Sequence, residues 1–220
     1  DGAGAAARFD LPQGLAIDAS GNLYVAEDTR FDRYRIRIIT PGGQVSTRPM
    51  EASAYEPSSL ASDAAGNLFA AFSSGIVRME ASGKIVLLAG DYNDKGTVDG
   101  NGGAARFASP AAITLDPAGN LYVADGATIR KVTPAGLVST VDGKPGVNGV
   151  KLGALPGGLR YPSCIAYGMR HARPALLLVN QGSIPETLLT NGWGWSGAGP
   201  FYAGASYAQS DVNVVSVALP

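Results

Sequence analysis

The chain contains the same sequence pattern three times. Residues 1–9 read DGAGAAARF, and residues 99–107 read DGNGGAARF. A turn sequence of Gly, Asn, Leu and an aromatic residue occurs at residues 21–24, 66–69 and 119–122. Such repeats are typical of folds that stack one small unit several times, because a single unit cannot bury both of its faces.

Each copy is predicted to form a small antiparallel sheet. In the first copy, four strands are expected at residues 15–17, 23–26, 35–39 and 45–47. Asp18 starts the first turn, where its carboxylate can accept backbone hydrogen bonds and Gly21 can adopt positive φ. The intervals are 45 and 53 residues, measured from Pro12 to Pro57 and then to Pro110. Four strands in such an interval form one propeller blade, so an all-β propeller of four-stranded antiparallel blades is predicted.

The repeated unit has a long and specific sequence pattern. Residues 7–26 read Ala-Arg-Phe-x-x-Pro-x-Gly-Leu-Ala-Ile-Asp-x-x-Gly-Asn-Leu-Tyr-Val-Ala, and residues 35–47 read Arg-Ile-Arg-x-Ile-Thr-Pro-x-Gly-x-Val-Ser-Thr. This pattern resembles the NHL-repeat β-propellers of bacteria, strongly in residues 1–50 and 99–142 and less strongly in residues 51–90. The resemblance implies a propeller, usually of six blades. It implies no single function, because NHL propellers include protein-binding, RNA-binding and sensing proteins and a few enzymes.

The repeats divide the chain into blades of unequal quality. Three blades are expected at about residues 1–50, 51–98 and 99–144, a degenerate fourth blade at 145–190, and a Gly- and aromatic-rich segment with a closing or partner-covering strand at 191–220. At 53 residues per unit, 220 residues make about four units. Three arrangements stay open: a compact ring of four or five blades, an open arc completed by a partner chain, and part of a longer propeller. An open arc would expose blade edges and one blade face, which favours association.

Composition narrows the function classes. Only 16% of the residues are charged and the formal net charge is −1, so neither nucleic acid nor an anionic membrane is the expected partner. No apolar run is long enough to span a membrane. A single cysteine excludes an intramolecular disulfide framework. Sparse charge and a first residue other than Met favour an exported bacterial protein, periplasmic or extracellular.

Arginine residues gather on one predicted strand. Arg33, Arg35 and Arg37 alternate along it and would share one face. Arginine binds phosphate, sulfate or carboxylate through paired N–H donors, so these residues are candidates for binding an anionic ligand. The alternative is a solvent-exposed outer strand on which the arginines pair with Asp28, Asp32 and neighbouring acidic residues.

The C-terminal segment contains a Gly-Trp-Gly-Trp sequence. Trp193 and Trp195 are candidate ligand-binding residues, because two indole rings can form a stacking platform for a sugar or an aromatic partner. The alternative is that they seal one end of the propeller. The letters also match G-x-G-x-x-G, but no βαβ unit surrounds them, so no dinucleotide cofactor is predicted.

An acidic loop precedes the third copy. It begins at Asp91 like a calcium loop, but Lys95 stands where an oxygen ligand is required, which excludes an EF-hand. A looser calcium site built from Asp91, Asn93, Asp94 or Asp99 is the alternative to a plain connection between blades. No other metal or cofactor is predicted.

No residue is predicted to be catalytic. His171 is the only histidine and is expected in a surface loop, and Cys164 lies in an apolar strand and is expected to be buried. Glu27, Asp63 and Asp116 fall at repeat positions that favour a structural role. The sequence therefore predicts a non-enzymatic scaffold that binds a protein or other macromolecule through inter-strand loops or an exposed blade edge.

Two alternatives to this scaffold stay open. One is a structural subunit that assembles into an oligomer or filament through open blade edges. The other is a lactonase-like, metal-dependent hydrolase. It stays open because the Asp and Glu carboxylates of such a site come together only in the folded structure and leave no local motif in the sequence.

Overall fold

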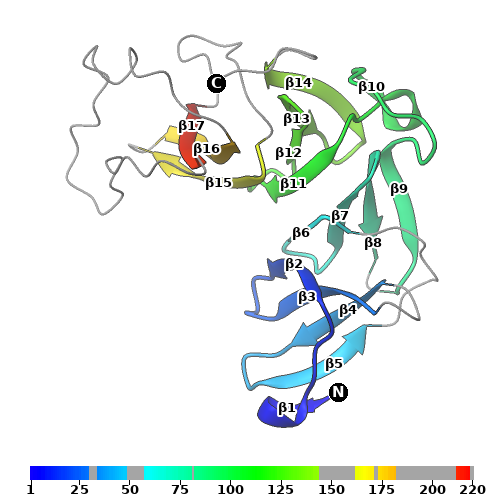
Figure 1. The fold of residues 1–220 in the computed structure, drawn as a ribbon, viewed down its shortest axis with the longest axis vertical. Coiled ribbons are helices and arrows are strands. Elements are labelled where there is room, and N and C mark those ends of the chain that lie inside the picture. The colour runs from blue at the N-terminus through cyan, green and yellow to red at the C-terminus, as the bar shows by residue number, and fades with distance from the viewer. Residues whose placement is uncertain are drawn as a thin grey trace.

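Four antiparallel sheets follow one another along an open arc (Figure 1). They belong to a computed structural model that describes residues 1–29, 34–48, 57–80, 82–143, 162–170, 173–181 and 212–218. We call the sheets blades 1 to 4 in chain order. This architecture confirms the predicted all-β propeller class, and within these ranges the blades do not close into a ring.

Blades 1 and 3 have five strands each in the same order. Blade 1 consists of β1 (Gly2–Ala3), β2 (Pro12–Ile17), β3 (Leu23–Asp28), β4 (Tyr34–Ile39) and β5 (Gln44–Arg48). Blade 3 consists of β10 (Gly100–Asn101), β11 (Pro110–Leu115), β12 (Leu121–Asp125), β13 (Thr128–Val132) and β14 (Leu137–Gly143). In both blades the short first strand pairs with the last strand, β5 in blade 1 and β14 in blade 3, and so lies at the outer edge of the sheet.

The short fifth strand differs from the four strands predicted for each blade. It comes from the repeated Asp-Gly segment, and a 3-10 helix follows it, η1 (Gly4–Ala6) in blade 1 and η2 (Gly102–Ala104) in blade 3. The sequence did not reveal this strand, because two residues are too few to show an alternation of polar and apolar side chains. These two helices are the only ones in the described ranges, and neither could cross a membrane.

Blades 2 and 4 have fewer strands. Blade 2 consists of β6 (Ser59–Ser62), β7 (Leu68–Phe72), β8 (Gly75–Met79) and β9 (Ile85–Gly90). Blade 4 consists of β15 (Cys164–Arg170), β16 (Arg173–Gln181) and β17 (Val212–Ala218), in that spatial order. Most of the Gly- and aromatic-rich segment, residues 191–211, lies outside the described residues.

The predicted turn between the first two long strands is present in blades 1, 2 and 3. Oδ1 of Asp18 accepts hydrogen bonds from the backbone N–H groups of Ser20 and Asn22, each at 2.9 Å. The side-chain amide of Asn22 donates to Oδ2, and this hydrogen bond lowers the pKa of Asp18. The two contacts from Asn recur at Asp63, from Asn67, and at Asp116, from Asn120. These acids therefore shape the turns.

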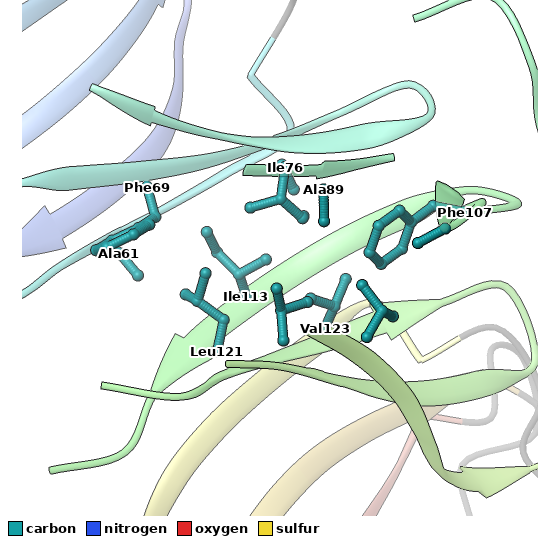
Figure 2. Close-up of a cluster of buried hydrophobic side chains, with 12 residues drawn as sticks. Ala61, Phe69, Ile76, Ala89, Phe107, Ile113, Leu121 and Val123 are labelled. Carbon is teal, nitrogen blue, oxygen red and sulfur yellow. The ribbon is translucent and has the colours of Figure 1, made fainter. Parts of the chain in front are cut away.

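The hydrophobic core lies between successive blades. We call the side of a blade that faces the preceding blade its upstream face, and the other side its downstream face. Between blades 2 and 3, the downstream face of blade 2 contributes Ala61, Phe69, Ala71, Ile76 and Ala89, and the upstream face of blade 3 contributes Ala105, Phe107, Ile113, Leu121, Val123, Val132 and Val138. Figure 2 shows these two sets pointing toward each other. Similar clusters join blade 1 to blade 2 and blade 3 to blade 4.

Candidate functional site

Arg35 and Arg37, two of the predicted ligand-binding residues, both contact the carboxylate of Glu27. Nε of Arg35 lies 2.7 Å from Oε2 of Glu27, and Nη1 of Arg37 lies 3.2 Å from the same oxygen. The pairing of β3 with β4 places Glu27 directly opposite Arg35. Arg35 is partly exposed, whereas Arg37 and Glu27 are buried. The third predicted arginine, Arg33, lies outside the described residues.

The expectation that the arginine face of this strand is solvent-exposed is wrong for Arg37. Its guanidinium is 2% exposed, and its Nη2 atom lies 3.0 Å from Oδ1 of Asp1. Nη1 also donates to the backbone carbonyl of Arg8, and the ring of Phe9 covers the guanidinium at 5.2 Å. The segment before β2 therefore folds over β4. The ion-pair partners of Arg37 are Glu27, one of the acids near the strand in sequence, and Asp1, which the sequence did not suggest.

Blade 3 repeats this arrangement with different residues. Nη1 of Arg130 lies 3.2 Å from Oδ2 of Asp125, and Nη2 lies 2.8 Å from Oδ1 of Asp99. The ring of Phe107 covers the guanidinium at 5.3 Å. We call each arginine with its two carboxylates a latch; the latches are Asp1, Glu27 and Arg37 in blade 1, and Asp99, Asp125 and Arg130 in blade 3.

The two carboxylates of the blade 3 latch have opposite pKa shifts. Burial raises the pKa of Asp125, and hydrogen bonds from Ser109 and the charge of Arg130 offset only part of this effect. Burial also acts to raise the pKa of Asp99, but hydrogen bonds from Thr140 and Arg130 outweigh it and lower the pKa. Arg130 donates to both carboxylates and to backbone carbonyls. Both terminal nitrogens of Arg130 are thus directed at groups of its own chain, which indicates a structural role.

The candidate calcium ligands contact other groups in the structure. Asp94 lies 2.8 Å from Nε of Arg106, and this hydrogen bond raises the pKa of the arginine. Oδ1 of Asp91 accepts a hydrogen bond from the backbone N–H of Asn93. Asp99 belongs to the blade 3 latch. In the part of the chain that the structure describes, no three His, Cys, Asp or Glu residues are grouped as metal ligands would be. Calcium binding stays a prediction.

The remaining candidates fall into two groups. Trp193, Trp195 and His171 lie outside the described residues. Cys164, expected to be buried, is exposed. It lies on the downstream face of β15, where no described blade follows, while its neighbour Ile165 is buried against blade 3.

The clearest feature of an interaction site is the upstream face of blade 1, which none of the other blades in the described residues covers. Two of its residues, Phe9 and Leu15, correspond to buried residues of blade 3 at an offset of 98 positions. Leu15 is 62% exposed, whereas its counterpart Ile113 is 5% exposed. Phe9 is 42% exposed, whereas Phe107 is fully buried. Ile17 is also 62% exposed.

We call this uncovered surface the open face; its exposed apolar residues are Phe9, Leu15 and Ile17. The sequence predicted that an open arc would expose one blade face, but it did not identify these residues. The signal that could have identified them is the match between Leu15 in the first copy and Ile113 in the third.

No protein-family model matches the chain, and no curated protein sequence matches it. The chain is similar to a structural genomics protein of unknown function from Bacteroides thetaiotaomicron. The two are 23% identical, with a TM-score of 0.65 over 76% of this chain and 44% of that protein.

Two auxiliary nutrient binding proteins are also similar in structure. The one from Bacteroides thetaiotaomicron is 20% identical, with a TM-score of 0.60 over 75% of this chain and 44% of that protein. The one from Bacteroides ovatus is 19% identical, with a TM-score of 0.58 over 76% of this chain and 45% of that protein. The chain thus spans less than half the length of these proteins, and identities this low show a shared fold alone.

Proposed function

We propose that the chain is a non-enzymatic β-propeller scaffold of the NHL type, exported from a bacterial cell, that binds a protein through the open face of blade 1. The observation that carries this proposal is the exposure of Leu15 at a position that blade 3 buries, with Ile17 exposed on the same strand. Fully burying one such side chain contributes about 1.5–3 kcal/mol relative to full exposure. The open face therefore offers a partner a substantial hydrophobic contribution.

The surroundings of the open face also suit a protein partner. Asp10 and Gln13 are exposed at neighbouring positions of the chain. An apolar centre with polar residues beside it is the usual composition of a protein–protein interface. Two of the solved proteins that share this fold are described as nutrient binding proteins, which is in line with a binding role.

The experiment is site-specific photo-crosslinking in the producing cells. A photoreactive amino acid replaces Leu15, and in the control protein it replaces Leu137, an exposed leucine on β14 that lies outside the open face. We expect a crosslinked protein with the Leu15 variant and none with the control. The crosslinked protein is then purified, and its Kd for the chain is measured by calorimetry.

A matched pair of charge substitutions tests whether the open face is the binding surface. Ile17→Lys places a charge in the interface and is expected to raise the Kd at least about tenfold, which corresponds to about 1.4 kcal/mol. Leu137→Lys is expected to leave the Kd unchanged. Both side chains are exposed, so circular dichroism should show both variants folded. Equal Kd values for wild type and Ile17→Lys would contradict the proposal.

A further inference from the structure

The blade that covers blade 3 shows what kind of surface fits the open face. The upstream face of blade 3 packs against the downstream face of blade 2, where Ala61 on β6 lies beside Phe69 on β7. The open face has the same residue types as the covered face of blade 3, because both come from the same repeat. Its natural complement is therefore the downstream face of another blade, with a small side chain next to a large apolar one.

Blade 4 presents such a downstream face. Ala166 on β15 pairs with Leu177 on β16, in the way that Ala61 pairs with Phe69 in blade 2. Leu177 is 46% exposed, although its neighbours Leu176 and Leu178 are fully buried against blade 3. Among the described residues, this downstream face is the one that has no following blade.

We infer that the open face of blade 1 binds blade 4 of a second copy of this chain. This inference rests on the proposed function, since it names the protein that occupies the same surface. The contact continues the interface that the chain already makes three times, in which the downstream face of one blade covers the upstream face of the next. Because two different faces meet, the assembly is head to tail, and it forms a ring if the rotation closes and a filament if it does not.

The first long strand of each blade, β2, β6, β11 or β15, predicts which residues meet across this contact. Between blades 2 and 3, Oγ of Ser59 accepts a hydrogen bond from the backbone N–H of Ile113 at 3.2 Å. Cys164 in blade 4 corresponds to Ser59 in blade 2. Each pairs with the second strand of its blade, and each directly precedes the residue that faces the preceding blade, Ile165 in blade 4 and Leu60 in blade 2. Blade 1 has Leu15 at the position of Ile113. Cys164 of one copy should therefore lie next to Leu15 of the other.

This prediction is testable with a disulfide, because Cys164 is exposed and is the only cysteine. A Leu15→Cys variant is oxidised mildly and analysed on a non-reducing gel. We expect intermolecular disulfides to form at least about tenfold faster than in a Leu137→Cys control, because the contact holds the two thiols together. Adding Cys164→Ser to the Leu15→Cys variant should abolish this difference. Equal rates for Leu15→Cys and Leu137→Cys would overturn the inference.

Light scattering supplies an independent readout. We expect the wild-type molar mass to rise with concentration above the 22.4 kDa of one chain. Ile17→Lys blocks the open face and Leu177→Lys blocks the blade 4 face, so each variant alone should remain monomeric. An equimolar mixture of the two should form a dimer, because each dimer can make one contact between two unaltered faces.

The outcomes separate this inference from the proposed function. A wild-type chain that is monomeric at every concentration would overturn the second copy as the occupant. The proposed function would still stand if Ile17→Lys weakened binding of the photo-crosslinked protein. A wild type that assembles while Ile17→Lys assembles equally well would also overturn the inference, because the contact would then not use the open face.

Discussion

Blades 1 and 3 have closely related sequences but different surroundings. Each has a latch, an aromatic ring over the latch arginine, and the same Asp-Asn turn. The upstream face of blade 3 is buried by blade 2, whereas Leu15 and Ile17 on the same face of blade 1 are exposed. The comparison shows that the latch forms within a blade, while burial of the apolar face depends on a neighbouring blade.

Blade 2 has no latch, because it has apolar residues at the positions of both the latch arginine and its buried carboxylate. Val77 and Phe72 stand where blade 3 has Arg130 and Asp125, because they occupy the same positions in the pairing of the two middle strands. Phe72 stacks on Tyr92 with ring centroids 5.1 Å apart. In the described residues, blade 2 also lacks the short fifth strand. The latch arginine and the short strand therefore form one unit, since the arginine binds the segment that carries the strand.

The largest expected effect comes from breaking a latch. Arg130→Val leaves the buried carboxylate of Asp125 without its counter-charge, and losing one partner of a buried ion pair costs about 3–5 kcal/mol. Arg37→Val should cost less, about 1–3 kcal/mol, because Glu27 keeps its contact with Arg35 at 2.7 Å. The free energy of unfolding, measured by urea denaturation, gives both values. An equal loss of unfolding free energy in the two variants would contradict the view that Arg35 compensates for the loss of Arg37 in blade 1.

A double substitution provides the control for this prediction. Arg130→Val with Asp125→Phe gives blade 3 the residues that blade 2 has at these positions. It should be more stable than Arg130→Val alone by at least about 1 kcal/mol, because no buried charge remains unpaired. If the double variant is no more stable than the single one, the loss comes from packing rather than from the unpaired carboxylate.

The next largest effect distinguishes the covered face from the open face. Ile113→Ala removes a buried side chain between blades 2 and 3, and such changes cost about 2–5 kcal/mol. Leu15→Ala at the matching position should cost less than about 1 kcal/mol, because the side chain already contacts water. Urea denaturation at low protein concentration tests this difference. An equally large cost for Leu15→Ala would show that something covers the open face even in the dilute chain.

Local sequence signals predicted the long strands and the turns but not the surroundings of the strands. The turn at Asp18 was predictable because its hydrogen-bond partners, Ser20 and Asn22, lie within four residues. The burial of Arg37 was not, because its partner Asp1 is 36 residues away and alternating polar residues usually indicate a solvent-exposed face. The predicted burial of Cys164 is wrong for a related reason. An apolar strand sequence does not reveal which face of the strand another blade covers.

The candidate site was likewise predictable in its general nature but not in its residues. The repeat predicted that an open arc exposes one blade face, since every blade needs neighbours on both sides. The residues that form that face are known only from the structure, in which Leu15 is exposed and its counterpart Ile113 is buried. Exposure is a property of the arrangement of the blades, and the two copies have almost the same sequence at these positions.

The smallest expected effect concerns two matched tyrosines. Burial raises the pKa of Tyr122 in blade 3 to about 12, and the negative charge of Asp116 adds to the shift. Burial also raises the pKa of Tyr24 in blade 1, but the charge of Arg48 acts against it, so Tyr24 should ionise before Tyr122. Because folding favours the neutral phenol, the stabilisation from Tyr122 is complete below pH 10 and is lost as the pH rises through about 12.

Ultraviolet absorbance of the phenolate measures both groups, one substitution at a time. Subtracting the titration of Tyr122→Phe from that of wild type should leave a step near pH 12, and Tyr24→Phe should leave a step at lower pH. Blade 2 has Phe69 at the corresponding position, so both substitutions fit the fold. A Tyr122 step at pH 10, the value for a free phenol, would mean that water reaches the junction between blades 3 and 4.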